Sequence, residues 1–178
     1  MKSNSTNLGS YLGAILTLTL VLFYAVDLNL FLNGWINLIT FFLIISFGVF
    51  SIIKEKKTLN GFINFKSAFT CFFLTTVIGV GISTAASIIV FGIIDTDAAN
   101  YLNELQLEKS MEMSKKIMEW LSVPKEVIIE ELSKLKNSTP NNYTIGAQFT
   151  SYIFSLAFFS LIGLIVAAIM KKRDKSQA

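Results

Sequence analysis

The strongest constraint on this chain is a run of 28 residues without a charged side chain, from Ser67 to Ile94. The run is rich in Phe, Ile and Val, with small residues between them. About 20 predominantly apolar residues in a helix cover the hydrocarbon core of a bilayer, which is roughly 30 Å thick. A run of this length and composition therefore predicts a transmembrane helix.

Three further apolar runs predict three more spans, so that the four lie at about residues 8–26, 34–53, 67–94 and 147–170. Only 15% of the 178 residues are charged, against about 25% in soluble domains. The predicted fold is all-α: a four-helix transmembrane bundle, with residues 1–178 forming a single integral membrane domain. The first apolar run, at about residues 8–26, is longer than the apolar region of a signal peptide, which has about 7–15 residues. We therefore expect a retained span there.

A polar insert, residues 95–146, separates the third and fourth predicted spans. Asp97 stands where a helix N-cap is expected, and apolar residues then follow helical spacing. Pro124 predicts the start of a second helix, because proline suits a first helical turn. We expect two amphipathic helices in the insert, packed against each other, over the bundle or along the membrane surface.

The link between the second and third spans carries a turn signal at Asn60-Gly61. Phe62, Phe65 and Phe69 follow at helical spacing, which predicts one aromatic helical face leading into the third span. Trp35 near the start of the second span is interpreted as an interface anchor, because Trp favours the headgroup level.

These features resemble a bacterial membrane protein family catalogued as domain of unknown function 4199, common in Bacteroidetes. The resemblance covers roughly Leu8 to Lys172. One departure is Thr96, where the family pattern has proline. The resemblance implies an integral membrane protein and brings no catalytic residues with it. The residues that carry it are Gly61, Phe62, Phe65, Ala68, Phe69, Ile94, Asp95, Lys171 and Lys172.

The distribution of charge predicts the orientation, because Lys and Arg in short loops mark the cytoplasmic side. The N-terminus, the second link and the C-terminal tail together carry a net charge of +7, whereas the first link and the insert carry −4. We therefore expect both termini in the cytoplasm and an extracytoplasmic, periplasmic insert. The basic positions are 2, 54, 56, 57, 66, 171, 172, 173 and 175.

The sequence has few features that indicate catalysis or ligand binding. It contains no His, the commonest general base and metal ligand, and none of the phosphate-loop, nucleophile-elbow or zinc motifs. No ionisable residue lies within the four predicted spans, which argues against a proton relay. The single cysteine, Cys71, is interpreted as a small apolar filler. We predict no catalytic, cofactor-binding or metal-binding residue, and no enzyme activity.

Small residues recur every four positions in the first, third and fourth spans, as at Gly9 and Gly13. Such stripes favour close helix packing over a groove lined by hydroxyls. In the insert, Glu104, Glu108 and Glu112 share one helix edge, interpreted as a solvated face rather than a cation site.

The sequence thus predicts a non-enzymatic membrane protein with a structural or interaction role in the bacterial cytoplasmic membrane. Its partners would be the lipid bilayer and, through residues 95–146, another protein or a second copy. We expect no nucleic acid and no cofactor. The alternative is a small permease or channel component that acts as an oligomer.

Overall fold

Long apolar stretches bounded by polar caps make this chain helical. The computed structural model describes residues 2–138 and 140–172, which contain no extended β-strand. A short 3-10 helix, η1, links α1 to α2, and a five-residue π-helix, η2, continues α3. The elements in chain order are α1 (Lys2–Val26), η1 (Leu28–Leu32), α2 (Gly34–Thr58), α3 (Phe65–Ile89), η2 (Val90–Ile94), α4 (Thr96–Trp120), α5 (Lys125–Ser138) and α6 (Ile145–Met170).

Four of these helices are long and apolar enough to cross a membrane. This confirms the prediction of an all-α chain with four spanning helices. Each helix extends beyond the apolar core that the sequence outlines, because a helix ends at its cap and not at its first charge. The candidate spans are Asn4–Val26, Gly34–Thr58, Phe65–Ile94 and Ile145–Met170.

Short polar side chains begin several of the helices. The Asn33 side chain accepts hydrogen bonds from the backbone N–H groups of Trp35 and Ile36, at 3.0 and 3.4 Å. Asn64 accepts from the Ser67 N–H at 2.8 Å, at the start of α3. These contacts satisfy backbone donors that have no partner within the first helical turn.

The turn after α2 is a tight reversal, as the Asn60-Gly61 signal predicted. Both residues take positive φ angles, 54° and 88°. The N–H of Gly61 donates to the carbonyl of Lys56 at 2.9 Å, the long-range bond of a Schellman cap. The expected aromatic face is wrong in one respect: Phe62 precedes α3, which begins only at Phe65.

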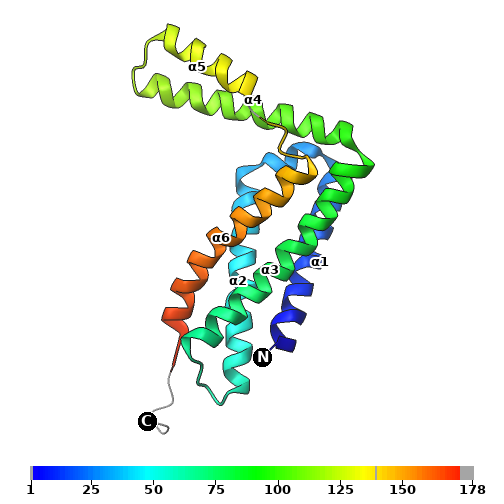
Figure 1. Cartoon of the computed structure of the whole chain (residues 1–178), viewed down its shortest axis with the longest axis vertical. Coiled ribbons are helices and arrows are strands. Elements are labelled where there is room, and N and C mark those ends of the chain that lie inside the picture. The colour runs from blue at the N-terminus through cyan, green and yellow to red at the C-terminus, as the bar shows by residue number, and fades with distance from the viewer. Residues whose placement is uncertain (1, 139, 173–178) are drawn as a thin grey trace. The chain divides into compact units, whose positions relative to one another are not determined.

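The chain forms two compact units. The first comprises Met1–Ser87 with Gln148–Ala178, and the second is Ile88–Ala147. In the first unit α1, α2, α3 and α6 run alongside one another (Figure 1). Its core is made of apolar residues from all four helices, among them Leu12, Ile52, Phe72 and Ala167, each fully buried.

The second unit is built around a helical hairpin of α4 and α5. Asp95, and not the predicted Asp97, caps α4: its carboxylate accepts a hydrogen bond from the Ala98 N–H at 2.8 Å. A capping side chain reaches the N–H two or three residues ahead, which fits Asp95 and leaves Asp97 in the first turn. Pro124 lies immediately before α5, and its carbonyl accepts the first bonds of that helix.

Candidate functional site

Close contact between α1 and α3 is made by glycines. A Cβ on Gly9 would lie 2.8 Å from Ile78 Cβ, and one on Gly13 would lie 2.7 Å from Ile82 Cβ. The space beside Gly79 of α3 is occupied in the same way by the side chain of Leu12 of α1. Real Cβ atoms do not approach this closely, so these glycines allow the two backbones to meet. The stripes are helix contacts, as the sequence interpretation favoured.

Phe72 of α3 joins three helices at one point. Its ring is fully buried and occupies the space beside Gly48 of α2 and Gly163 of α6. Two glycines on different helices thus form a slot for one aromatic ring. Interiors pack at crystal-like density, so this slot fixes how α2, α3 and α6 approach one another.

A buried carboxylate lies at the end of α2, within the candidate span. Glu55 is 2% exposed, and the Asn4 amide of α1 donates a hydrogen bond to its Oε2 at 3.3 Å. This corrects the prediction that the spans hold no ionisable residue, because α2 continues past Ile53 to Thr58. Burying a carboxylate requires compensating hydrogen bonds or charge, and Asn4 supplies one.

Hydroxyl groups next to this carboxylate join α1, α2 and α3. The Oγ atoms of Ser5 and Ser51 lie 2.9 Å apart, and Ser51 Oγ also lies 3.2 Å from the carbonyl of Cys71. Thr75 Oγ1 donates to the carbonyl of Ser5 at 3.2 Å. We call Asn4, Ser5, Ser51, Glu55 and Thr75 the buried polar cluster.

The buried polar cluster was missed from the sequence, but helical periodicity could have found it. Ile44, Gly48, Ser51 and Glu55 recur at intervals of three or four and are all buried. Extending the buried face of α2 by one turn places Glu55 upon it. Cys71, interpreted as an apolar filler, is 1% exposed and fits that role.

A second set of polar contacts joins α3 to α6. Ser87 Oγ donates to the Gln148 side-chain oxygen at 2.6 Å, and Tyr152 Oη donates to the carbonyl of Val77 at 3.0 Å. Gln148 is 7% exposed. Interhelical hydrogen bonds of this kind stabilise packed helices in an apolar environment, so both polar sets hold helices together.

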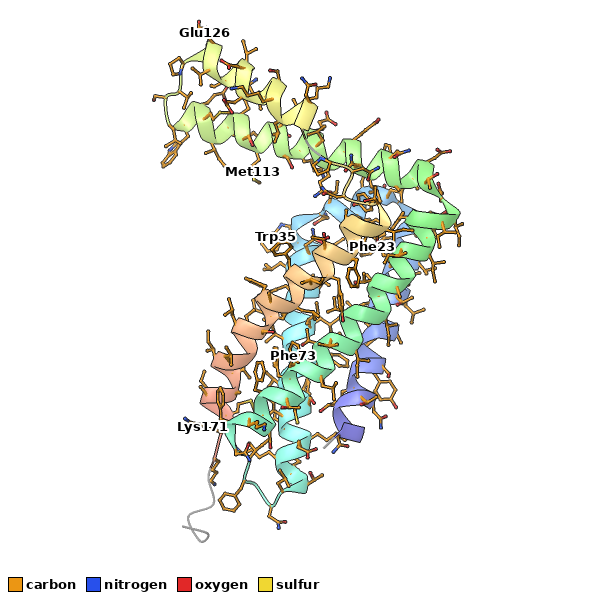
Figure 2. The ribbon with its side chains drawn as sticks, viewed as in Figure 1. Phe23, Trp35, Phe73, Met113, Glu126 and Lys171 are labelled. Carbon is orange, nitrogen blue, oxygen red and sulfur yellow. The ribbon has the colours of Figure 1, made fainter. Side chains whose placement is uncertain are left out.

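The basic segments of the first unit meet at one end of the bundle. Lys56 Nζ donates to the carbonyl of Met170 at 3.0 Å, at the end of α6. Ile63 and Lys172 exchange two backbone hydrogen bonds, and the Lys172 ammonium lies 5.4 Å from the centre of the Phe62 ring. Lys171 directly follows the last residue of α6 at this end (Figure 2). The predicted basic tail beyond Lys172 lies outside the described residues.

Within the second unit, α4 and α5 leave an open groove between them. Its volume is about 310 Å³, and it is walled mainly by apolar side chains. Apolar residues along the hairpin are strongly exposed, with Ile117 at 51%, Leu121 at 59% and Ile129 at 69%. The groove is lined by Ser114, Ile117, Met118, Glu131, Leu132 and Leu135.

The acidic edge of α4 is solvent-exposed. Glu104, Glu108 and Glu112 all lie on the surface, and Glu112 forms an ion pair with Lys116 at 2.7 Å. That hydrogen bond and the charge of Lys116 lower the pKa of Glu112 from its ordinary value. The pairing makes this edge an ordinary helix surface.

Comparison with known proteins identifies the family. The family model described as "Protein of unknown function (DUF4199)" matches residues 7–172. The chain belongs to this DUF4199 family. Searches of the curated proteins and of the solved structures gave no match.

The residues that suggested the DUF4199 family have structural roles in this chain. Gly61 supplies the positive φ angle of the turn before α3, and Ala68 is fully buried in the core. Asp95 caps α4, and Thr96, which replaces the expected proline, is the first residue of that helix. The pattern therefore marks turns, caps and packing positions.

Proposed function

We propose that this DUF4199 protein is a non-enzymatic protein of the bacterial cytoplasmic membrane that binds another protein through the α4–α5 hairpin. The observation that carries this proposal is the groove between the two helices. Ile117, Met118, Leu132 and Leu135 give it an apolar floor, and Ser114 and Glu131 add polar atoms. Grooves of this kind accept the apolar face of an amphipathic helix.

The packing of the bundle favours this role over a permease. The small-residue stripes that could line a pathway are occupied by Ile78, Ile82 and Leu12. The hydroxyl of Thr75 bonds to the backbone of a neighbouring helix. These contacts support a dry interior between the helices that the structure describes, and so favour packing over a substrate path in the monomer.

We further propose that both termini lie in the cytoplasm and that the hairpin lies outside it. The start of α1 contacts the end of α2, and Lys56 contacts the end of α6. The basic residues described there, with those of the α2–α3 link, gather at one end of the bundle. The positive-inside rule assigns that end to the cytoplasm.

Site-specific photo-crosslinking in the native host tests the binding role. A photo-crosslinking amino acid at Ser114 or Glu131 would face the groove, and the same probe at Lys115 is the matched control. Lys115 lies next to Ser114 in sequence but does not line the groove. We expect a discrete adduct with another protein from the two groove positions and much less from Lys115.

Two outcomes contradict the binding proposal. Equal adducts from groove and control positions would indicate unspecific contact. An adduct with the mass of two copies would show self-association in place of a different partner.

The topology is tested separately by labelling cysteines that are introduced one at a time. The native Cys71 is 1% exposed and gives a low background. With a membrane-impermeant maleimide, Ser110→Cys should react in intact spheroplasts and Lys57→Cys only after lysis. The reverse pattern would overturn the orientation without affecting the binding proposal.

A further inference from the structure

One face of α4 combines large apolar side chains with lysines. Lys109, Met113, Lys116 and Trp120 follow one another at intervals of four, three and four residues, so they lie in one line along the helix. We call them the Lys109–Trp120 face. Met113 projects from the side of α4 that is turned away from α5 (Figure 2). This face is therefore separate from the groove.

The exposure of the Lys109–Trp120 face is high. Trp120 is 82% exposed and Met113 65% exposed, and the Lys116 side chain is 71% exposed. Lys116 forms an ion pair with Glu112 of the same helix, and both partners of this i, i+4 pair are exposed. Such pairs are weak, so the ammonium can exchange Glu112 for another anion.

The residue types match those of helices that lie at a membrane surface. Trp favours the headgroup level of a bilayer, and the long stem of Lys lets its ammonium reach the phosphates while the methylenes stay on apolar surface. Interfacial helices combine Trp and other apolar residues with lysines in this way. The acidic edge of α4 borders this face at Glu112, which pairs with Lys116, whereas Glu104 and Glu108 lie further round the helix.

The chain ties the start of α4 directly to the end of a candidate span. The candidate span Phe65–Ile94 is followed by Asp95 alone before α4 begins at Thr96. A segment tethered this closely meets the membrane surface at a high effective concentration, so even weak contacts suffice for docking.

We propose that the Lys109–Trp120 face docks on the phospholipid headgroups of the bilayer that the four apolar helices cross. Trp120 and Met113 lie at the headgroup level, and Lys109 and Lys116 contact lipid phosphates. The groove between α4 and α5 then stays open to a protein. The inference does not depend on that partner, and it holds for either orientation of the chain.

Tryptophan fluorescence of the full chain in phospholipid nanodiscs tests the proposal. The sequence has two tryptophans, so Trp35→Phe leaves Trp120 as the only one. Brominated phosphatidylcholines quench tryptophan at the depth of the bromine. We expect strong quenching of Trp120 by bromines near the headgroup, weaker quenching by bromines deep in the acyl chains, and an emission shifted to shorter wavelength.

Matched variants separate docking from folding. Lys109→Glu with Lys116→Glu, in the same Trp35→Phe background, reverses both exposed charges and should reduce the shallow quenching. Lys115→Glu, on another side of α4, should leave it unchanged. Circular dichroism of each variant confirms that the hairpin is intact.

Two results would overturn the proposal. In the first, neither the shallow nor the deep brominated lipid quenches Trp120, and iodide has full access to it in the nanodisc. In the second, iodide reaches Trp120 in nanodiscs but not in native membranes, which would show that a protein covers this face.

Discussion

The ring of Phe72 occupies the place that a methyl group on Gly163 would need. A Cβ built on Gly163 would lie 2.7 Å from Phe72 Cδ1, and the opposite side of the same ring lies against Gly48. The ring therefore cannot move away from one of these glycines without approaching the other. One aromatic side chain thus sets the spacing of three helices.

Gly163→Ala should destabilise the bundle for this reason. Overpacking a filled core costs about 1–3 kcal/mol, and we expect a loss of that size in the free energy of unfolding measured in mixed micelles. Phe72→Leu in the Gly163→Ala background should restore part of the loss, because a smaller side chain vacates the slot.

Gly146→Ala is the matched control, since a Cβ there meets nothing within 4 Å. It lies in the same helix and should be neutral or slightly stabilising, because alanine favours helices over glycine. Equal losses for Gly163→Ala and Gly146→Ala would contradict the claim that the Phe72 ring leaves no space for a side chain at position 163.

The second prediction concerns Glu55 in the buried polar cluster. Glu55→Ala removes the acceptor of the Asn4 amide and leaves that donor without the bond, which should cost about 1–3 kcal/mol in unfolding free energy. Glu55→Gln retains an oxygen for Asn4 and should cost less. The measurement is reversible unfolding in micelles, with exposed Lys54→Ala as the neutral neighbour. A loss as large for Lys54→Ala would show that burial of Glu55 is not the cause.

Much of the fold follows from hydropathy alone, because a bilayer demands long apolar helices whose backbone groups are satisfied internally. Hydropathy does not locate helix ends. The charges at Lys54 and Glu55 marked the end of the second run, yet α2 continues to a Schellman cap at Asn60. Asp95 and Asp97 are both suitable caps by residue type, and only the geometry at Ala98 distinguishes them.

The candidate site was harder to predict for a related reason. Glu55 has the sequence context of a surface charge, because three lysines lie beside it. Its side chain is nevertheless buried, and its hydrogen bond comes from Asn4, 51 positions away in the sequence. A single sequence gives the face on which a residue lies but not the helix that covers that face. The apolar residues of α4 likewise predict an amphipathic helix, but their spacing does not indicate what they contact.

The third prediction uses two adjacent isoleucines in α5. Ile128 is 5% exposed and Ile129 is 69% exposed, so only the first packs within the hairpin. Ile128→Ala should increase amide hydrogen exchange throughout α4 and α5, because buried Ile→Ala changes cost about 2–5 kcal/mol. Exchange in the core of α2 should not change, since it belongs to the other compact unit. Ile129→Ala is the control, and faster exchange in that variant would contradict the packing described.

The fourth prediction concerns Ser122 in the turn between α4 and α5. Its φ angle is 57°, a left-handed conformation that costs residues with a side chain about 1–2 kcal/mol. Ser122→Gly should therefore stabilise the hairpin and slow its hydrogen exchange. Asn60→Gly is the comparison: Asn tolerates this conformation better, so its gain should be smaller. A destabilised Ser122→Gly hairpin would show that the serine side chain matters more than the backbone.

The fifth prediction concerns pH and Tyr143, in the loop before α6. Its ring lies edge-on to Phe91, with the ring centres 5.6 Å apart, and burial raises the pKa of its phenol. The folded state therefore holds this proton more tightly than the unfolded state does. The contribution of this phenol to the free energy of unfolding is complete below the unfolded pKa of about 10. It is lost as the pH rises from there through the folded pKa.

Difference titration of phenolate absorbance, wild type minus Tyr143→Phe, measures that pKa directly. We expect the Tyr143 component to titrate above the ordinary tyrosine range while the chain stays folded, and to return to that range in denaturant. The pH at which the second unit loses hydrogen-exchange protection should rise in Tyr143→Phe, because that variant has no phenol to ionise at this position. Titration of Tyr143 at its ordinary pKa in the folded protein would show that the loop does not bury the ring against Phe91.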